Sequence, residues 1–125
     1  VCSSDLGAIF PQVNFPAHQA QLGMTFGAKT NFPDKYKNGI FVTAHGSWNR
    51  TEASGAEVQF VPVKKGKAGK MEVFASGFLN KKTGTYHGRP VDVAVMKDGS
   101  MLVSDDYAGA IYRISYNGEQ VASTK

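Results

Sequence analysis

Apolar and polar residues alternate in short runs along this chain, and turn residues separate the runs. Fourteen glycines and five prolines interrupt every window long enough for a three-turn helix. The runs are rich in β-branched and aromatic residues, which favour strands. We predict strands at residues 22–26, 39–44, 57–63, 71–75, 90–96, 101–104 and 110–116. The pattern therefore predicts an all-β fold.

Three residue pairs carry the chemistry of tight turns. Asn38-Gly39, Asp98-Gly99 and Asn117-Gly118 supply the positive backbone angles that hairpins require. Segment 29–37 is too irregular for a strand, and we expect it to form a long surface loop.

The chain also resembles itself. Residues 40–45 match residues 101–106, and Gly55-Ala56 matches Gly109-Ala110 at the head of the next strand. The same order of three strands therefore occurs twice, with a period of roughly 60 to 70 residues that loops have lengthened beyond a typical propeller blade.

Segments 22–26 and 91–95 are the first strands of the two units, and the second unit ends after three strands. A β-propeller ends in this way when a strand from the N-terminus closes the ring. We predict one blade at 18–80 and an incomplete last blade at 88–116, within a propeller domain that covers 7–125.

The composition is that of a globular protein rather than a disordered or membrane protein, with 42% hydrophobic and 19% charged residues and a net charge of +4. No apolar run approaches the roughly 20 residues of a membrane helix. Four lysines, Lys64, Lys65, Lys67 and Lys70, are predicted to lie in a solvated loop. Nucleic acid is not expected as a partner, because interleaved aromatic residues and a reading helix are missing.

The first six residues fit nothing that follows them. The chain begins with Val1 rather than Met, and we interpret 1–6 as a non-native remnant, with a processed native N-terminus as the alternative. Residues 1–10 lack the features of a signal peptide. Cys2 is the single cysteine, so it does not reveal the redox compartment.

A cluster of chemically active side chains follows strand 39–44. His45, Trp48, Asn49 and Arg50 place an imidazole, an indole, an amide and a guanidinium in one turn. Such a cluster at a strand end is predicted to face a ligand. Two structural alternatives stay open: His45 bonding to its own loop, and Trp48 packing as a lid.

Further along, Arg113 is expected to face solvent or to pair with Asp105 or Asp106. Asp105 and Asp106 are not expected to chelate a metal together, because consecutive strand residues point to opposite faces.

Nine motifs in order resemble the C-terminal part of the glucose and sorbosone dehydrogenase family, and its sorbosone-dehydrogenase-like branch most closely. They are LGMTF at 22–26, FP at 32–33, YKNG at 36–39, HGSWNR at 45–50, GFL at 77–79, GRPVDVAV at 88–95, DG at 98–99, LVSDD at 102–106 and IYRI at 111–114. The order of the series is more specific than any motif in it.

The resemblance implies a six-bladed β-propeller, exported to the periplasm or secreted, that oxidises a sugar with pyrroloquinoline quinone (PQQ) and Ca²⁺ and passes electrons to an external acceptor. In such enzymes a histidine takes the substrate proton while hydride passes to the quinone. That histidine and the calcium ligands lie in earlier blades. The chain is thus expected to be a C-terminal fragment, inactive alone, with no catalytic or metal residue of its own.

The resemblance also assigns roles to residues of this chain. Arg89 is expected to face a carboxylate of the quinone, for which a planar guanidinium is suited. His45 and Arg50 lie in the loop that lines the pocket, and Trp48 and His18 are further candidate contacts.

Three classes of function remain open at this stage. The first is part of a quinone-dependent sugar dehydrogenase, and the second is a non-enzymatic propeller that binds carbohydrate or protein. The third is a basic module that binds polyanions through the lysines of segment 64–70.

Overall fold

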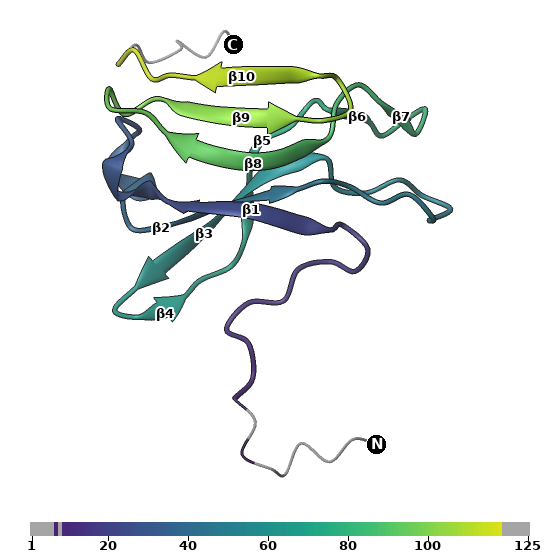
Figure 1. Ribbon diagram of the computed structural model, residues 1–125. Helices are drawn as coiled ribbons and strands as arrows, with labels where there is room; N and C mark the ends of the chain where they lie inside the picture. Colours follow the sequence, from purple (N-terminus) through teal and green to yellow (C-terminus); the bar gives the residue numbers. More distant parts are fainter. Residues whose placement is uncertain (1–6, 8, 119–125) are drawn as a thin grey trace, which may run out of the picture.

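Antiparallel strands build the fold, and the computed structural model describes Gly7 and residues 9–118 (Figure 1). In the first sheet β1, β2 and β3 lie in sequence order, and both β4 and β5 pair with β3. These strands are β1 (Gln21–Phe26), β2 (Gly39–Ala44), β3 (Glu57–Lys64), β4 (Lys67–Ala68) and β5 (Glu72–Ala75).

The second sheet is an antiparallel meander of three strands, β8 (Pro90–Val95), β9 (Met101–Asp105) and β10 (Ala110–Ile114). Between the sheets the chain forms a small hairpin of β6 (Leu79–Asn80) and β7 (Thr85–Tyr86). The all-β prediction is confirmed, since the helices of the described residues are two short 3-10 turns, η1 (Gly27–Lys29) and η2 (Asp34–Tyr36). Among those residues no helix has the length and apolar character that crossing a bilayer requires.

The predicted strands agree with the observed ones to within two residues at each end, and the repeated order of three strands is present in β1–β2–β3 and in β8–β9–β10. Sequence reasoning missed β4, β6 and β7. Each has two residues, which is too short for an alternating pattern to identify. The predicted boundaries of the two blades stay a prediction, and residues 1–6 lie outside the described part of the chain.

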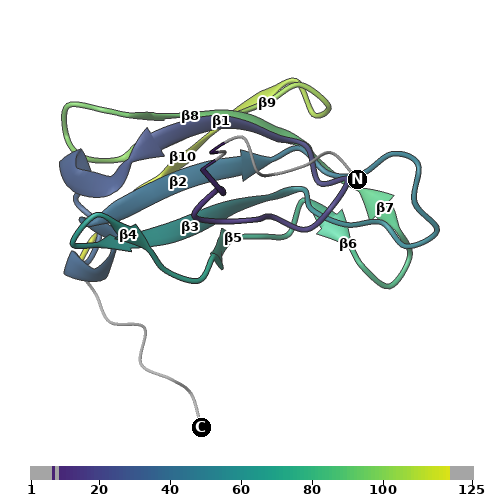
Figure 2. The same ribbon diagram turned by 90° about the horizontal axis from the view of Figure 1, so that it is seen from below.

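The two sheets pack face to face, with β1 and β2 against β8 (Figures 1 and 2). Their shared core consists of Phe32, Phe41, Val58, Phe60, Val93, Met101 and Val103. Tyr36, Phe74, Ala75 and Ile114 extend the core at its margin. Because β2, β3, β8 and β9 each alternate, the residues between these core positions point to the opposite faces of the two sheets.

Segment 29–37 contains no strand, as predicted, and five of its residues are exposed, but two of its side chains enter the interior. Thr30 is 2% exposed and Phe32 is 4% exposed. The Thr30 hydroxyl donates to the carbonyl of Gly27 at 2.7 Å, and the backbone N–H of Asn31 donates to the carbonyl of Gly99 in the other sheet at 2.9 Å. The 3-10 turns satisfy the backbone locally, so Phe32 can enter the aromatic core.

Two turn predictions also need correction. Gly39 has no positive φ; it opens β2, where a Cβ would lie 2.3 Å from Cζ of Phe60, so close packing requires glycine. The lysine segment is exposed to solvent, as predicted, but it forms a hairpin, since Lys65 and Gly66 turn with φ of 50° and 75° between β3 and β4. Gly99 and Gly118 have the predicted positive φ, 83° and 77°.

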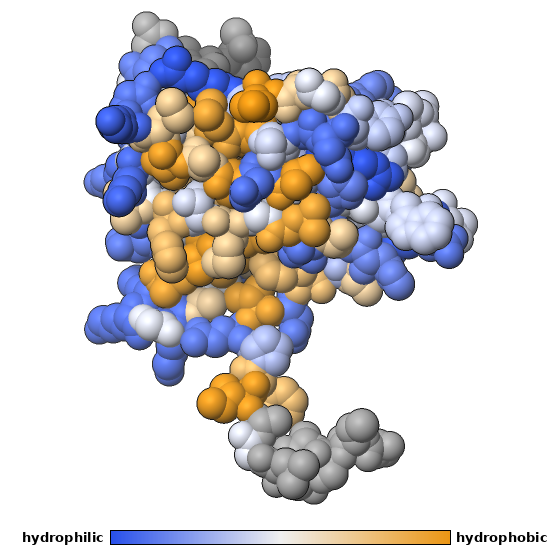
Figure 3. All heavy atoms as spheres, viewed as in Figure 1, coloured by the Kyte–Doolittle hydropathy of each residue, from blue (hydrophilic) through white to orange (hydrophobic). Residues whose placement is uncertain are grey.

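The outward face of the first sheet is apolar and exposed along β1, whereas Val42 on β2 and Val61 on β3 are 8% and 4% exposed. Leu22, Met24 and Phe26 on β1 are 52%, 55% and 68% exposed. Beside them lies a groove of about 900 Å³, whose lining includes Ile40 and Val61. In the view of Figure 3, hydrophobic side chains lie across the middle of the molecule, and hydrophilic side chains lie toward its two ends. The first sheet therefore has apolar residues on both faces.

Candidate functional site

The predicted site residues gather at one end of the two sheets, where β2 and β9 finish and β8 begins. This end, called the site end below, comprises segments 17–20, 45–56, 86–90 and 105–106. The loop 45–56 and the β6–β7 hairpin extend side by side there in both ribbon views (Figures 1 and 2).

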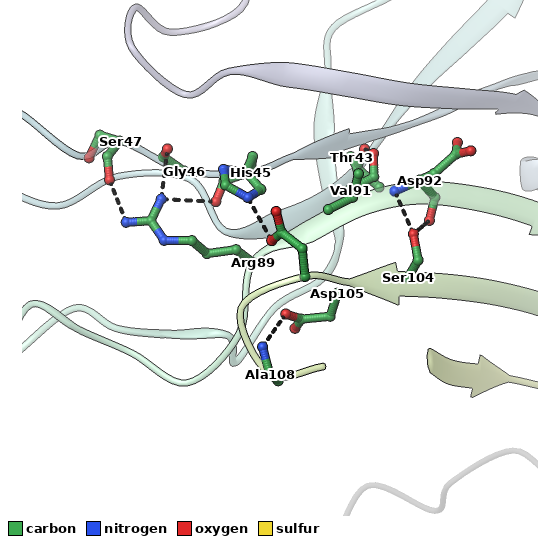
Figure 4. Close-up of polar contacts among 11 residues, drawn as sticks. Thr43, His45, Gly46, Ser47, Arg89, Val91, Asp92, Ser104, Asp105 and Ala108 are labelled. Atoms are coloured by element: carbon green, nitrogen blue, oxygen red, sulfur yellow. Dashed lines mark hydrogen bonds and ion pairs between the residues drawn. The ribbon is translucent and has the colours of Figure 1, made fainter. Parts of the chain in front are cut away.

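Arg89 connects the two sheets at the site end. Its Nη1 donates to the carbonyl of Gly46 at 3.1 Å and lies 3.5 Å from that of His45, and its Nη2 donates to the carbonyl of Ser47 at 3.0 Å (Figure 4). The guanidinium also stacks on the Tyr86 ring, with Cζ 3.7 Å from the ring centroid. A planar fork of donors suits this arrangement of carbonyls.

Ser47 forms hydrogen bonds to three residues: Ser54 within the loop 45–56, and Tyr86 and Arg89 outside it. Its backbone N–H donates to the carbonyl of Ser54 at 2.8 Å, and its hydroxyl accepts from the Ser54 N–H at 3.0 Å. Its carbonyl accepts from the Tyr86 hydroxyl at 2.6 Å as well as from Arg89. Gly46 has a φ of 101°, and a Cβ there would lie 2.9 Å from Cε1 of Tyr86, so the loop can approach the ring only with glycine.

His45 faces the second sheet. Its Nε2 lies 2.9 Å from Oδ1 of Asp106, the residue after β9, and its side chain is 24% exposed. The hydrogen bond from His45 lowers the pKa of the Asp106 carboxyl below its ordinary value of 3.8. The predicted alternative, in which His45 bonds to its own loop, is not what the structure shows: the ring joins the two sheets.

The other three predicted residues lie at the rim. Arg50 donates to the carbonyl of Ala17 at 3.1 Å, which ties the loop 45–56 to the segment that carries His18. His18 is exposed and has a φ of 64°, a left-handed conformation that is uncommon for a residue with a side chain. Trp48 is 90% exposed at the loop tip. None of the hydrogen bonds or ion pairs found among the described residues joins these three side chains to His45 or Arg89.

A buried polar chain supports the loop from the outward face of the first sheet. The Gln59 amide donates to Oε1 of Gln19 at 3.0 Å and to Oε1 of Glu57 at 2.9 Å. The Gln19 amide donates to the Ser54 hydroxyl at 2.7 Å. Glu57 and Gln59 are 5% and 0% exposed, so these bonds satisfy groups that would otherwise be costly to bury.

The residues at the site end fit a group that carries carboxylates. In the part of the chain that the structure describes, no carboxylate forms an ion pair with Arg89. A guanidinium has five N–H donors, so the carbonyls of the loop leave capacity for a ligand. No three His, Cys, Asp or Glu side chains gather as a metal site among the described residues.

Two residues of the site end were missed or misassigned from sequence. Tyr86 was not predicted, because no local pattern marks its ring as a partner of Arg89. Arg113 was expected to face solvent or to pair with Asp105 or Asp106: its side chain is 60% exposed, but its partner is Asp98, so the predicted pairing is wrong. Arg113 lies opposite Leu102 near the start of β9, so it pairs with Asp98, while Asp106 lies beyond the far end of β9 and meets His45.

Comparisons with known proteins place the chain in a family and identify structures that share its fold. The family described as TrAA12-like matches residues 1–117. An uncharacterized protein of Borreliella burgdorferi is 40% identical over 103 residues, which cover 81% of this chain and 27% of that protein. The chain therefore spans about a quarter of this relative's length.

Two solved structures share the fold. The holo form of the pyranose dehydrogenase PQQ domain from Coprinopsis cinerea has a TM-score of 0.67 at 25% identity, over 87% of this chain and 30% of that one. The iodide structure of Trichoderma reesei carbohydrate-active enzyme family AA12 has a TM-score of 0.64 at 19% identity, over 79% of this chain and 25% of that one.

Proposed function

Because the chain belongs to the TrAA12-like family, we propose that it is part of a PQQ-dependent dehydrogenase that oxidises a sugar, and that its site end forms one wall of the quinone pocket. Membership in this family of quinone-dependent oxidoreductases confirms the resemblance that the order of the motifs predicted. The substrate class, the cofactor and the role of the site end belong to the proposal.

The observation that carries the proposal is the placement of Arg89. Its charge faces an aromatic ring and the carbonyls of the loop, that of His45 included, with no carboxylate partner among the described residues. Charged groups at the end of a packed core are normally paired or bound to a ligand. The carboxylates of PQQ are partners of the required charge and geometry for a guanidinium.

The side chains of this chain would bind and orient the quinone. Arg89 would donate to one carboxylate, and His45 would hold its own position through Asp106 while its ring lines the pocket. Arg50, Trp48 and His18 would border the pocket where a sugar enters. When bound, the quinone supplies the two-electron acceptor for oxidation of the sugar.

The base histidine and the calcium ligands are proposed to come from other blades of the same protein. The exposed outward face of β1 supports this, because Leu22, Met24 and Phe26 form an apolar surface suited to packing against another blade. On this account the two sheets are the last two blades of a six-bladed propeller, exported to the periplasm or secreted, with an external electron acceptor.

Turnover by the full-length product of the gene tests the proposal. With added PQQ and Ca²⁺, the protein should reduce an artificial dye in the presence of an aldose or a related sugar, and omission of either the quinone or the sugar should abolish reduction. Quinone binding without turnover on any sugar of a broad panel would instead favour a non-enzymatic binding protein. Absence of both would contradict the proposal.

A further inference from the structure

The β6–β7 hairpin ends in Tyr86, which contacts both halves of the site end. Its hydroxyl donates to the carbonyl of Ser47 at 2.6 Å and lies 3.2 Å from the Ser47 hydroxyl. Its ring lies under the guanidinium of Arg89 at 3.7 Å. One side chain thus touches the loop of the first sheet and the arginine that opens the second.

The contacts of Tyr86 are geometrically coupled. Arg89 and the Tyr86 hydroxyl donate to the same acceptor, the carbonyl of Ser47, so the position of that carbonyl fixes both side chains. Ser47 in turn exchanges two hydrogen bonds with Ser54, which closes the loop 45–56. A shift of the Tyr86 hydroxyl would therefore move the loop that carries His45 and Arg50.

Apart from Tyr86, the hairpin contributes the buried side chain of Leu79 to the fold. β6 and β7 pair only with each other within the described chain, and the side chain of Thr85 is exposed. Tyr86 is half-buried, and its hydroxyl is bonded on the side that faces the loop. A two-stranded hairpin of this size is not stable alone, so its conformation depends on what Tyr86 and Leu79 contact.

We propose that Tyr86 is a positioning residue of the quinone pocket, which holds the loop 45–56 and the Arg89 guanidinium in the arrangement that binds the cofactor. The inference rests on the proposed function, because it names the residue that orients that same site. Arg89 alone has flexible torsions; a ring beneath it and a shared carbonyl acceptor limit the directions in which its remaining N–H groups can point.

Two variants of the full-length protein separate the contacts of Tyr86. Tyr86→Phe keeps the ring and removes the hydrogen bond to Ser47, whereas Tyr86→Leu removes both. We expect the amides of Ser47 and Ser54 to exchange hydrogen several-fold faster in Tyr86→Phe, and the Kd for PQQ to rise roughly tenfold. Tyr86→Leu should raise the Kd by a further three- to tenfold through loss of the stacked ring.

The control is Tyr107→Phe. Tyr107 lies on the turn after β9, near the site end, and is 61% exposed. In Tyr107→Phe, the hydrogen-exchange rates of the Ser47 and Ser54 amides and the affinity for PQQ should equal those of the unmodified protein. Melting temperatures measured for all variants separate a local effect from general destabilisation, since Tyr86→Phe should change affinity much more than the melting temperature.

Unchanged exchange of the loop amides in Tyr86→Phe would overturn the inference, and so would faster exchange with unchanged PQQ affinity. Failure of the unmodified protein to bind PQQ would contradict the proposed function, and with it the cofactor part of this inference. The exchange measurement needs no quinone, so it would still decide whether Tyr86 holds the loop.

Discussion

The two ends of the sheet pair are joined by different chemistry. At the site end, Arg89 and His45 cross between the sheets with hydrogen bonds to backbone carbonyls and to Asp106. At the opposite end, called the turn end below and comprising segments 27–38 and 96–100, aromatic packing around Phe32 and one backbone hydrogen bond from Asn31 to Gly99 make the connection.

Apolar packing is the stronger and simpler way to join two sheets, as the turn end shows. Charged side chains add little net stability, because they lose hydration when they meet. Ion pairs occur at both ends, but Arg113–Asp98 and Lys35–Glu72 at the turn end each lie within one unit, whereas Arg89 and His45 at the site end connect the two sheets. Charged links between the sheets at the site end alone fit the ligand site that we propose there. The comparison predicts that changes at the turn end lower stability, whereas changes at the site end lower ligand affinity.

The largest effect on stability is expected from Phe32→Ala. Phe32 is 4% exposed, and its ring centroid lies 5.3 Å from that of Phe74 and 5.9 Å from that of Phe41. Loss of this ring should lower the free energy of unfolding of the full-length protein by about 3 to 5 kcal/mol, measured by urea denaturation. The control Tyr107→Ala, at an exposed position, should cost less than about 0.5 kcal/mol. Equal losses would show that the turn end is not held by aromatic packing.

A smaller effect is expected from Thr43→Val, between the two ends. The buried Thr43 hydroxyl donates to the carbonyl of Val91 in β8 at 2.6 Å and accepts from the N–H of Gly23 in β1 at 2.9 Å. Valine has nearly the same shape but leaves both backbone groups without that partner. The free energy of unfolding should fall by about 1 to 3 kcal/mol. Thr43→Ser keeps the hydroxyl and should lose less; if Thr43→Val loses no more than Thr43→Ser, the hydroxyl does not link the strands.

Each end also contains one carboxyl whose pKa a separate hydrogen bond lowers. The pKa of Asp106 is lowered mainly by the hydrogen bond from His45, and that of Asp98 mainly by the hydrogen bond from the Ser100 hydroxyl. A lowered pKa in the folded state means that each contribution to stability is present above the ordinary value of 3.8 and is lost as pH falls through the folded pKa.

Substitution at either end should therefore act on one carboxyl alone. His45→Gln should raise the pKa of Asp106 and leave that of Asp98 unchanged. Ser100→Ala should raise the pKa of Asp98 and leave that of Asp106 unchanged. Carbon-detected NMR titration of the carboxyl groups measures both. A shift of both pKa values in either variant would mean that the two ends are not independent.

The smallest effect is expected from Arg113→Gln at the turn end. Arg113 pairs with Asp98 across a solvent-exposed surface, with side-chain exposures of 60% and 52%. Exposed pairs of this kind contribute little, so both stability and PQQ affinity should stay close to those of the unmodified protein. Loss of PQQ affinity in this variant would mean that the ligand contacts the turn end, and would contradict the assignment of the ligand site to the site end.

The strands and their repeated order could be predicted from sequence, because alternation and turn residues act locally. What could not be predicted depends on contacts between distant segments. Phe32 was assigned to a surface loop, since nothing near it reveals that two 3-10 turns carry it into the core. Gly39 was assigned to a turn, because the Phe60 ring that excludes a Cβ lies in another strand.

In the candidate site, too, local sequence identified the residues but not their contacts with distant segments. The cluster 45–50 and Arg89 were identified from residue types and motif order, and the structure places them at one end. The partners of these residues were not identified. The bonds from Arg89 to the carbonyls of the loop, the pairing of His45 with Asp106, and the position of Tyr86 beneath Arg89 all arise from sheet packing, which no local pattern encodes.

The affinity of the full-length protein for PQQ, with and without the substitution Arg89→Ala, tests the central claim most directly. Titration of the metal-supplemented apoprotein with PQQ should show saturable binding, and Arg89→Ala should weaken it by about 2 to 4 kcal/mol, which corresponds to roughly 30- to 700-fold in Kd. Equal affinity of the two proteins for PQQ would show that Arg89 only holds the loop 45–56, and would contradict the assignment of the site end to the quinone pocket.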